Sequence, residues 1–187
     1  MSRGFVEMPM GEHVELHAHT VPSPLGPIMF VTEAGVLCGL DFADGEARLR
    51  QLLSRRYGDV ALRRRGDALG IAEKIEDYFA GDLHALDTVP VNPGGTEFQR
   101  TVWRALRSIP AGSTQSYAGL AAAIGRPGAP RAVGSANARN PVALVIPCHR
   151  LIGSNAALTG YAGGLERKRW LLRHEARCGA LLLTSNR

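Results

Sequence analysis

The chain has 187 residues, of which 45% are hydrophobic and 21% are charged, proportions typical of a globular protein whose core needs no disulfide support. No run approaches the roughly 18 apolar residues of a membrane helix, and the N-terminus lacks the apolar block of a secretory signal. The three cysteines, Cys38, Cys148 and Cys178, are an odd number at wide spacing. They argue against a disulfide framework and predict a protein of the reducing cytoplasm with no membrane partner.

The charge is divided unevenly along the chain. Up to Asn92 there are 9 Lys and Arg against 14 Asp and Glu, whereas from Pro93 onward there are 13 against 3. Almost all the bases are arginine, which suits bidentate contacts with phosphates and bases. A genome that prefers arginine codons would explain arginine in place of lysine, but not the scarcity of acids in the second half. The asymmetry predicts a polyanionic partner for that half, with nucleic acid as the first candidate.

The first half has the pattern of a small sheet with helices packed on it. Alternating or apolar runs predict strands at about residues 12–21, 27–32 and 35–43. Asp44 and Gly45 open a predicted helix that ends near Tyr57, and a second helix is expected at about residues 67–80. A mixed α/β fold follows.

A linker is predicted at residues 87–95 (DTVPVNPGG), which are rich in proline and glycine. The charge switch falls on this segment. We therefore expect two domains, an α/β domain over residues 1–92 and a mainly helical domain over residues 93–187.

Helices dominate the prediction for the second half. Thr96 and Gln99 have the spacing of a capping box, and the apolar stripe that follows predicts a helix that ends at Pro110. The apolar run at residues 142–146 predicts a buried strand, and residues 166–177 predict a final helix.

A helix-turn-helix pattern lies between these segments. It consists of a short helix over residues 116–124, a turn at 125–129 and a helix from Pro130 to about Arg139. Residues 131–136 (RAVGSA) place an arginine at the start of a helix with very small side chains. Small residues allow the close approach that a narrow minor groove demands. The alternative is a helix that packs closely on another helix.

The sequence IPCHR at residues 146–150 is the sharpest local feature. A thiol reacts as the thiolate, and a neighbouring imidazole or cation helps to form it. Because adjacent side chains rarely bond directly, His149 would act on Cys148 through a bridging water. A base also needs an orienting partner, and Glu175 in the last helix offers one. The alternative is a buried cysteine beside a surface His-Arg pair.

Two metal sites are alternatives to these assignments. A zinc site could use Cys148, His149, His174 and Cys178, but there is no CxxC or HxxxH pair and adjacent ligands rarely share one tetrahedral site. Another could use His13, His17 and His19 on one strand face, together with Cys38. An ordinary strand face is the better interpretation, and we expect no metal and no other cofactor.

The second half resembles the O6-alkylguanine-DNA alkyltransferases (methylated-DNA–protein-cysteine methyltransferases). The resemblance runs from about Gly95 to Glu175, in collinear order. It rests on the segments GTEFQRTVWRAL, SYAGLA, PRAVGSAN, NPVALVIPCHRLIG, TGYAGG and RKRWLLRHE. The first half shares only its general strand-helix character and the phrase DYFAG at residues 77–81.

The resemblance implies a role for each matching residue. Cys148 would be the alkyl acceptor, His149 the water-mediated base and Glu175 the partner that orients His149. The residues expected to contact DNA are Arg131, which would enter the base stack, and Ala132, Gly134 and Ser135. The residues expected around the extruded guanine are Tyr117, Asn140, Leu151, Tyr161 and Ala162.

The fold implied is a C-terminal domain of winged-helix type that carries the helix-turn-helix. The function implied is stoichiometric, irreversible transfer of the alkyl group from O6-alkylguanine to Cys148, with O4-alkylthymine as a second candidate substrate. The partner would be double-stranded DNA bound through its minor groove, with no small-molecule cofactor. A DNA-binding regulator or damage-recognition protein without transfer is the first alternative, although such relatives have the cysteine replaced. A Cys-His-Glu thiol hydrolase is the second, but it leaves Arg131 and the basic half unexplained.

Overall fold

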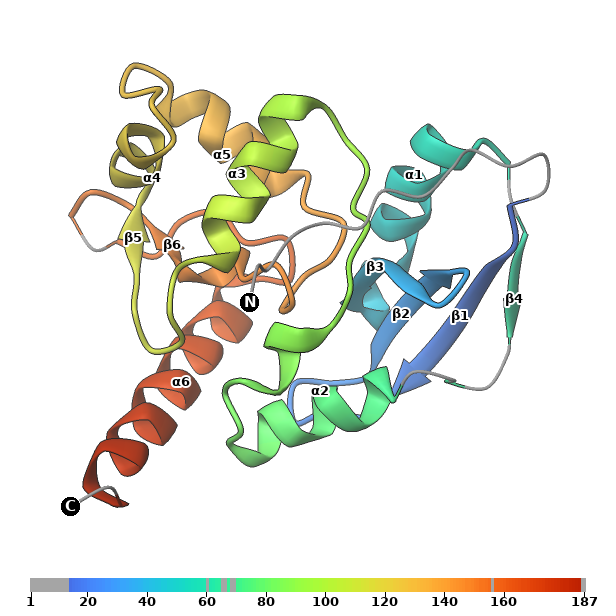
Figure 1. Ribbon diagram of the computed structural model, residues 1–187, viewed down its shortest axis with the longest axis horizontal. Helices are drawn as coiled ribbons and strands as arrows, with labels where there is room; N and C mark the ends of the chain where they lie inside the picture. The colour runs from blue at the N-terminus through green and yellow to red at the C-terminus, as the bar shows by residue number, and fades with distance from the viewer. Residues whose placement is uncertain (1–13, 60, 65–66, 68–69, 156, 186–187) are drawn as a thin grey trace.

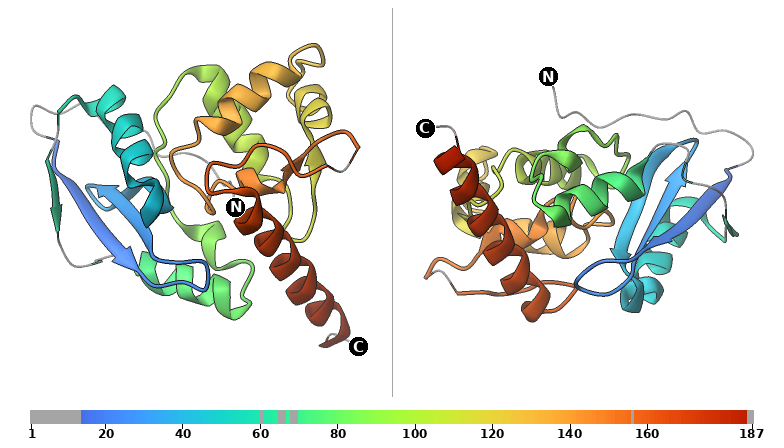
Figure 2. Two further views of the ribbon diagram at one scale, coloured as in Figure 1. Left: turned by 180° about the vertical axis from the view of Figure 1, so that it is seen from behind. Right: turned by 90° about the horizontal axis from the view of Figure 1, so that it is seen from below.

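The computed structural model describes residues 14–59, 61–64, 67, 70–155 and 157–185. A four-stranded sheet lies at one end of the molecule, and the C-terminal end of the last helix projects from the other (Figures 1 and 2). Within the described residues, no helix is both long and apolar enough to span a membrane. The prediction of a mixed α/β fold is confirmed.

The sheet has the order β3-β2-β1-β4. Its strands are β1 (Leu16–Val21), β2 (Ile28–Glu33), β3 (Val36–Phe42) and β4 (Leu62–Arg64). The first three confirm the predicted strands and pair antiparallel, whereas β4 runs parallel to β1. Strand β4 was not predicted, because a three-residue strand with two arginines has no apolar alternation.

Two helices follow the strands of the first half. A 3₁₀ turn (Ala43–Gly45) leads into α1 (Glu46–Tyr57), and α2 covers Ile71–Ala80. The second helix begins later than expected, after Gly70, which has a φ of 62°. A left-handed residue cannot continue a helix, so Gly70 sets the start of α2. A short 3₁₀ helix (Ala85–Thr88) then leads toward the second half.

Four α-helices dominate the described part of the second half. They are α3 (Glu97–Arg107), α4 (Tyr117–Ala123), α5 (Pro130–Ala138) and α6 (Leu165–Ser185). The capping box is confirmed, since the Thr96 side chain accepts from the Gln99 amide and the Gln99 side chain accepts from the Thr96 amide. The helix-turn-helix pattern is confirmed as α4, a turn and α5. A short parallel pair, β5 (Gln115–Ser116) and β6 (Leu151–Ile152), lies beside it, while the winged-helix classification stays a prediction.

The predicted strand at residues 142–146 is wrong. The segment is entirely buried, but only Val142 makes a strand-like bridge, with Leu40. The rest folds into tight turns, in which Leu144 has a φ of 64°. The Asn140 side chain holds these turns by accepting from the Val142 amide and donating to the Ile146 carbonyl. An apolar run signals burial, and burial alone does not distinguish a strand from a packed turn.

The two halves share a continuous core. Leu40 of β3 exchanges backbone hydrogen bonds with Pro141 and Ala143 of the second half. The segment predicted as a linker lies along the same strand, where Leu37 bonds to Pro90 and Asn92. The proposed domain boundary after Asn92 stays a prediction, but the described segment there is packed against β3.

Candidate active site

Cys148 begins a 3₁₀ turn (Cys148–Arg150) directly after Pro147. Its side chain is buried, with 6% of the residue exposed. It lies on the wall of a cavity of about 190 Å³, which we call the Cys148 cavity. This cavity is bounded by β3, α1, the end of α5 and the glycine-rich loop at residues 160–163. A small group that enters the cavity can therefore meet the sulfur.

The surroundings of Cys148 hold the thiol protonated. Burial raises the pKa of the Cys148 thiol, and the contact with the Asn140 side chain only partly opposes that effect. Because the thiolate is the nucleophile, the site needs a base that acts when the substrate is bound. The neighbouring side chain supplies one.

His149 is fully buried and its Nε2 lies 2.8 Å from Glu175 Oε1. Burial lowers the pKa of His149, and the carboxylate of Glu175 only partly restores it. The neutral ring donates from Nε2 to the carboxylate, which leaves Nδ1 as the acceptor. Nδ1 has no hydrogen-bonding partner among the described residues. The expected pairing of His149 with Glu175 is therefore present in the structure.

Glu175 is the centre of a larger buried network. Its carboxylate accepts from the Tyr78 hydroxyl at 2.8 Å, the Arg150 guanidinium at 2.8 Å and the Gly112 amide at 3.1 Å. Burial alone would raise the pKa of Glu175, but His149 and Arg150 outweigh it and hold the pKa well below its usual range. Glu175 is thus a fixed negative charge beside the imidazole.

Sequence reasoning missed Tyr78 and Gly112, and it noted Arg150 only as a neighbour of the thiol. The phrase DYFAG, which contains Tyr78, was the one available signal, because it was the only first-half segment with a family resemblance. Tyr78 lies on α2 of the first half, 97 residues from Glu175 along the chain. Sequence separation of this size conceals a contact that only packing creates.

Besides Tyr78, a second residue of the first half, Arg48 of α1, makes hydrogen bonds to the second half beside the cavity. Its guanidinium donates to Asp41 at 2.6 Å, to the Ala138 carbonyl at 2.8 Å and to the Asn140 carbonyl at 2.9 Å. Both Asp41 and Arg48 line the Cys148 cavity. The expected site residue Asn140 is thus held from both halves, and neither Asp41 nor Arg48 was anticipated.

The remaining expected substrate residues lie in the glycine-rich loop or on the segments that Tyr117 and Leu151 begin. Tyr161 and Ala162 line the Cys148 cavity, and the Tyr161 hydroxyl has no hydrogen-bonding partner within the described structure. Tyr117 starts α4 and its hydroxyl donates to the Thr159 carbonyl at 3.4 Å. Leu151 follows the 3₁₀ turn, and its amide donates to the Cys148 carbonyl.

Lys168 of α6 is a further residue that the sequence did not reveal. Its side chain is fully buried, and Nζ donates to the Leu151 carbonyl at 2.5 Å and to the Thr159 carbonyl at 2.7 Å. One ammonium therefore ties the last helix to Leu151 in β6 and to Thr159, just before the glycine-rich loop. A buried lysine requires such acceptors, because an unpaired buried charge is very costly.

The expected DNA-contacting residues lie on α5, outside the Cys148 cavity. Arg131, Ala132 and Ser135 are exposed, whereas Gly134 is half-buried against the Tyr117 ring. The helix packs through Val133 and Ala136, which are buried. Its outward face is thus made of one long cation and small side chains.

The alternative metal sites do not assemble in the described residues. No group of three or more His, Cys, Asp or Glu side chains in that part of the chain is placed to hold a metal ion. His174 bonds instead to the Tyr78 carbonyl, and His19 stacks on Phe30. Cys38 donates to the Val31 carbonyl, and His13 lies outside the described residues.

Known proteins match both parts of the chain. The DNA-binding domain of 6-O-methylguanine DNA methyltransferases matches residues 97–177. A methylated-DNA–protein-cysteine methyltransferase of Salmonella typhimurium is 48% identical over 166 residues, which cover 87% of this chain and 95% of that protein. One of Mycobacterium bovis is 41% identical over 163 residues, with 86% and 92% covered.

Solved structures agree with these matches. Mycobacterium tuberculosis OGT in complex with DNA has a TM-score of 0.72 at 40% identity and covers 87% of this chain and 94% of its own. The O6-methylguanine-DNA methyltransferase of Pyrococcus kodakaraensis has a TM-score of 0.69 at 27% identity, with 86% and 98% covered. With the buried Cys-His-Glu arrangement, these similarities establish that the chain belongs to the methylated-DNA–protein-cysteine methyltransferases.

Proposed function

We propose that this protein repairs O6-alkylguanine in DNA by moving the alkyl group to its own Cys148. The observation that carries the proposal is the buried pair of His149 and Glu175 next in the chain to Cys148, which lines a cavity large enough for a small substrate group. Relatives named methylated-DNA–protein-cysteine methyltransferase support the same assignment. The fixed charge of Glu175 makes His149 a competent base in a site that otherwise keeps the thiol neutral.

The transfer is a displacement at the alkyl carbon. The Cys148 proton passes through a bridging water to His149 Nδ1, and Glu175 stabilises the imidazolium that forms. The sulfur then bonds to the carbon as the bond from that carbon to guanine O6 breaks. Hydrogen bonds from the Tyr117 hydroxyl and the Ala162 amide would stabilise charge on the departing oxygen.

DNA presents its base to this site only after the base leaves the helix. The target carbon is hidden within the duplex stack, so the nucleotide must be flipped out. The small outward residues of α5 suit close approach through the minor groove, and Arg131 would fill the space left by the base. Backbone carbonyls of Cys148 and Leu151 would accept from the guanine amine, with Tyr161 beside them.

The product determines how often one molecule can act. A thioether has no good leaving group, so neither water nor a second thiol reverses the step readily and each molecule acts once. O4-alkylthymine is a second candidate substrate. We propose that the protein works in the cytoplasm, where reduced thiols persist, which fits its three free cysteines.

Intact-mass measurement after incubation with duplex DNA that contains O6-methylguanine tests the proposal. We expect a gain of one methyl group per protein, mapped to Cys148, and no gain in Cys148→Ala. Methylation of Cys38 or Cys178, or many turnovers per molecule, would contradict it. Binding without any mass change would favour the alternative of a damage-recognition protein, and thiol-dependent hydrolysis would favour a hydrolase.

A further inference from the structure

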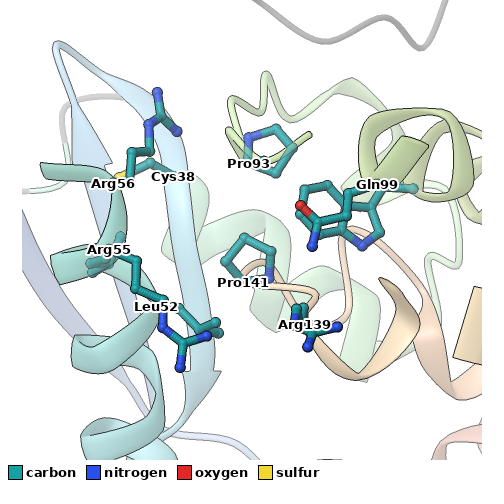
Figure 3. Close-up of a pocket in the computed structure, with 11 residues that line it drawn as sticks. Cys38, Leu52, Arg55, Arg56, Pro93, Gln99, Arg139 and Pro141 are labelled. Carbon is teal, nitrogen blue, oxygen red and sulfur yellow. The ribbon is translucent and has the colours of Figure 1, made fainter. Parts of the chain in front are cut away.

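A second cavity, of about 350 Å³, lies between the two halves of the molecule. It opens between α1 on one side and α3 with the end of α5 on the other (Figure 3). Three arginines line it, Arg55 and Arg56 from α1 and Arg139 from the end of α5, and we call it the arginine cleft. Among the described residues that line it there is no carboxylate. It shares no lining residue with the Cys148 cavity.

The three arginines differ in how they are neutralised. Arg56 donates to the Asn92 carbonyl at 2.5 Å and to Glu33 at 3.3 Å, so its charge is matched. Arg139 is exposed and bonds only to the backbone and side chain of Ser135, which carry no charge. Arg55 is exposed, and the described structure gives it no hydrogen bond or ion pair. Within the described residues, two guanidinium groups of the cleft therefore have no counter-charge.

Helix geometry alone explains part of this arrangement. Arg55 lies in the last turn of α1 and Arg139 at the end of α5, where a cation is favoured by the helix dipole. That effect acts on each helix separately. It does not account for two such ends that face one cavity, drawn from the acidic and the basic halves of the chain.

The cleft continues the surface expected to meet DNA. Arg131, Ser135 and Arg139 are spaced by four residues, so they follow one face of α5. Eight residues of helix cover about 12 Å. Arg139 contacts the Ser135 side chain, so the outward face of α5 runs without a break into the cleft.

We propose that Arg55 and Arg139 together bind one phosphate of the DNA backbone, so that the first half of the chain takes part in DNA binding. The inference rests on the proposed function only in placing DNA on α5. Guanidinium groups suit phosphate oxygens. A contact of this kind fixes the position of the duplex and carries no sequence information.

The salt dependence of binding to an undamaged duplex tests the proposal. Each phosphate contact releases counterions, and its loss should make the plot of log K against log salt shallower by about 0.9. For Arg55→Gln we expect the slope to become shallower by up to this amount, because Arg139 keeps part of the contact. The affinity should weaken by the same several-fold factor for different DNA sequences. Arg55→Lys should recover most of the slope, because the positive charge is kept.

Arg50→Gln is the matched control. Arg50 lies on the same helix and is exposed, but it pairs with Glu46 and does not line the cleft. Its replacement should leave the slope unchanged. An unchanged slope in Arg55→Gln, or an equal change in both variants, would overturn the proposal.

Reaction of each variant with a free O6-alkylguanine base separates this inference from the proposed function. We expect Arg55→Gln to be alkylated at Cys148 at the wild-type rate. If no variant and no wild-type protein is alkylated while the slope still responds to Arg55, the proposed function fails and the phosphate contact stands. If alkylation is normal and the slope is unmoved, only the phosphate contact fails.

Discussion

The two halves of this protein differ in how many functional motifs can be recognised in their sequences. The second half carries the PCHR segment, the helix-turn-helix and the glycine-rich loop, all of which are short motifs with local meaning. The first half has no comparable motif, yet it delivers Tyr78 to Glu175 and Arg48 to Asn140. A half of the chain without recognisable motifs can thus still complete the buried side of an active site.

The hydrogen bonds from the first half matter because Glu175 is buried. Glu175 must stay charged in a place where burial alone would neutralise it, and donors from both halves keep it charged. Removing one donor from such a network costs more than the average hydrogen bond, because the remaining buried groups lose their compensation.

The largest effect is expected from the second half, at Glu175. Glu175→Gln removes the charge that stabilises the imidazolium, so we expect transfer from duplex DNA to slow by about a hundredfold. DNA affinity should stay nearly constant, as measured by fluorescence anisotropy. Circular dichroism must first establish that the variant is folded, since Glu175 also holds Arg150. A folded variant with an unchanged rate would remove Glu175 from the catalytic network.

A smaller effect is expected at Arg131, on the outward face of α5. If Arg131 fills the gap left by the flipped base, Arg131→Ala should slow repair of duplex DNA by roughly tenfold or more. Reaction with a free O6-alkylguanine base requires no flipping and should change far less. Single-turnover rates on the two substrates check this. Equal losses on both would assign Arg131 to the fold or the pocket instead.

The contribution of the first half is tested by Tyr78→Phe. This change deletes only the hydroxyl that donates to Glu175, and a hydrogen bond to a charged group is worth about 1.5–3 kcal/mol. We expect lower stability in urea unfolding and a several-fold slower transfer. Because Glu175 becomes more basic, the rate–pH profile should also shift toward higher pH.

Phe79→Leu is a suitable control, since Phe79 packs beside Tyr78 without a hydrogen bond to the network. It should alter stability without moving the pH profile. If Tyr78→Phe also leaves the profile in place, the first half supports the fold and not the chemistry.

The smallest effect concerns stability against pH. Burial lowers the pKa of His149, so between its folded and unfolded pKa values the unfolded chain binds the proton and the folded protein does not. Stability should therefore fall as the pH drops below about 6.5, by roughly 1 kcal/mol or more. Urea unfolding at several pH values measures this dependence. It should be weaker in His149→Gln, and a dependence of equal size there would place its origin elsewhere.

Several features were predictable from short stretches of sequence. The first three strands, the capping box at Thr96 and the helix that begins at Pro130 follow from local spacing and local hydrogen bonds. The pairing of His149 with Glu175 was expected because a base needs an orienting carboxylate, and the family resemblance implied the same pair. The apolar run at residues 142–146 was assigned to the wrong structure, because its turns depend on the Asn140 side chain.

The nucleophile and the base could be found in the sequence, because a thiol and an imidazole keep their chemistry wherever they lie. Packing in three dimensions selects the groups that surround them. Tyr78, Arg48 and Lys168 are ordinary residues on ordinary helices until packing brings them to Glu175, Asn140 and the loop. Electrostatic interactions and burial depend on distances in space. The distance between two side chains in the fold cannot be read from their separation along the chain.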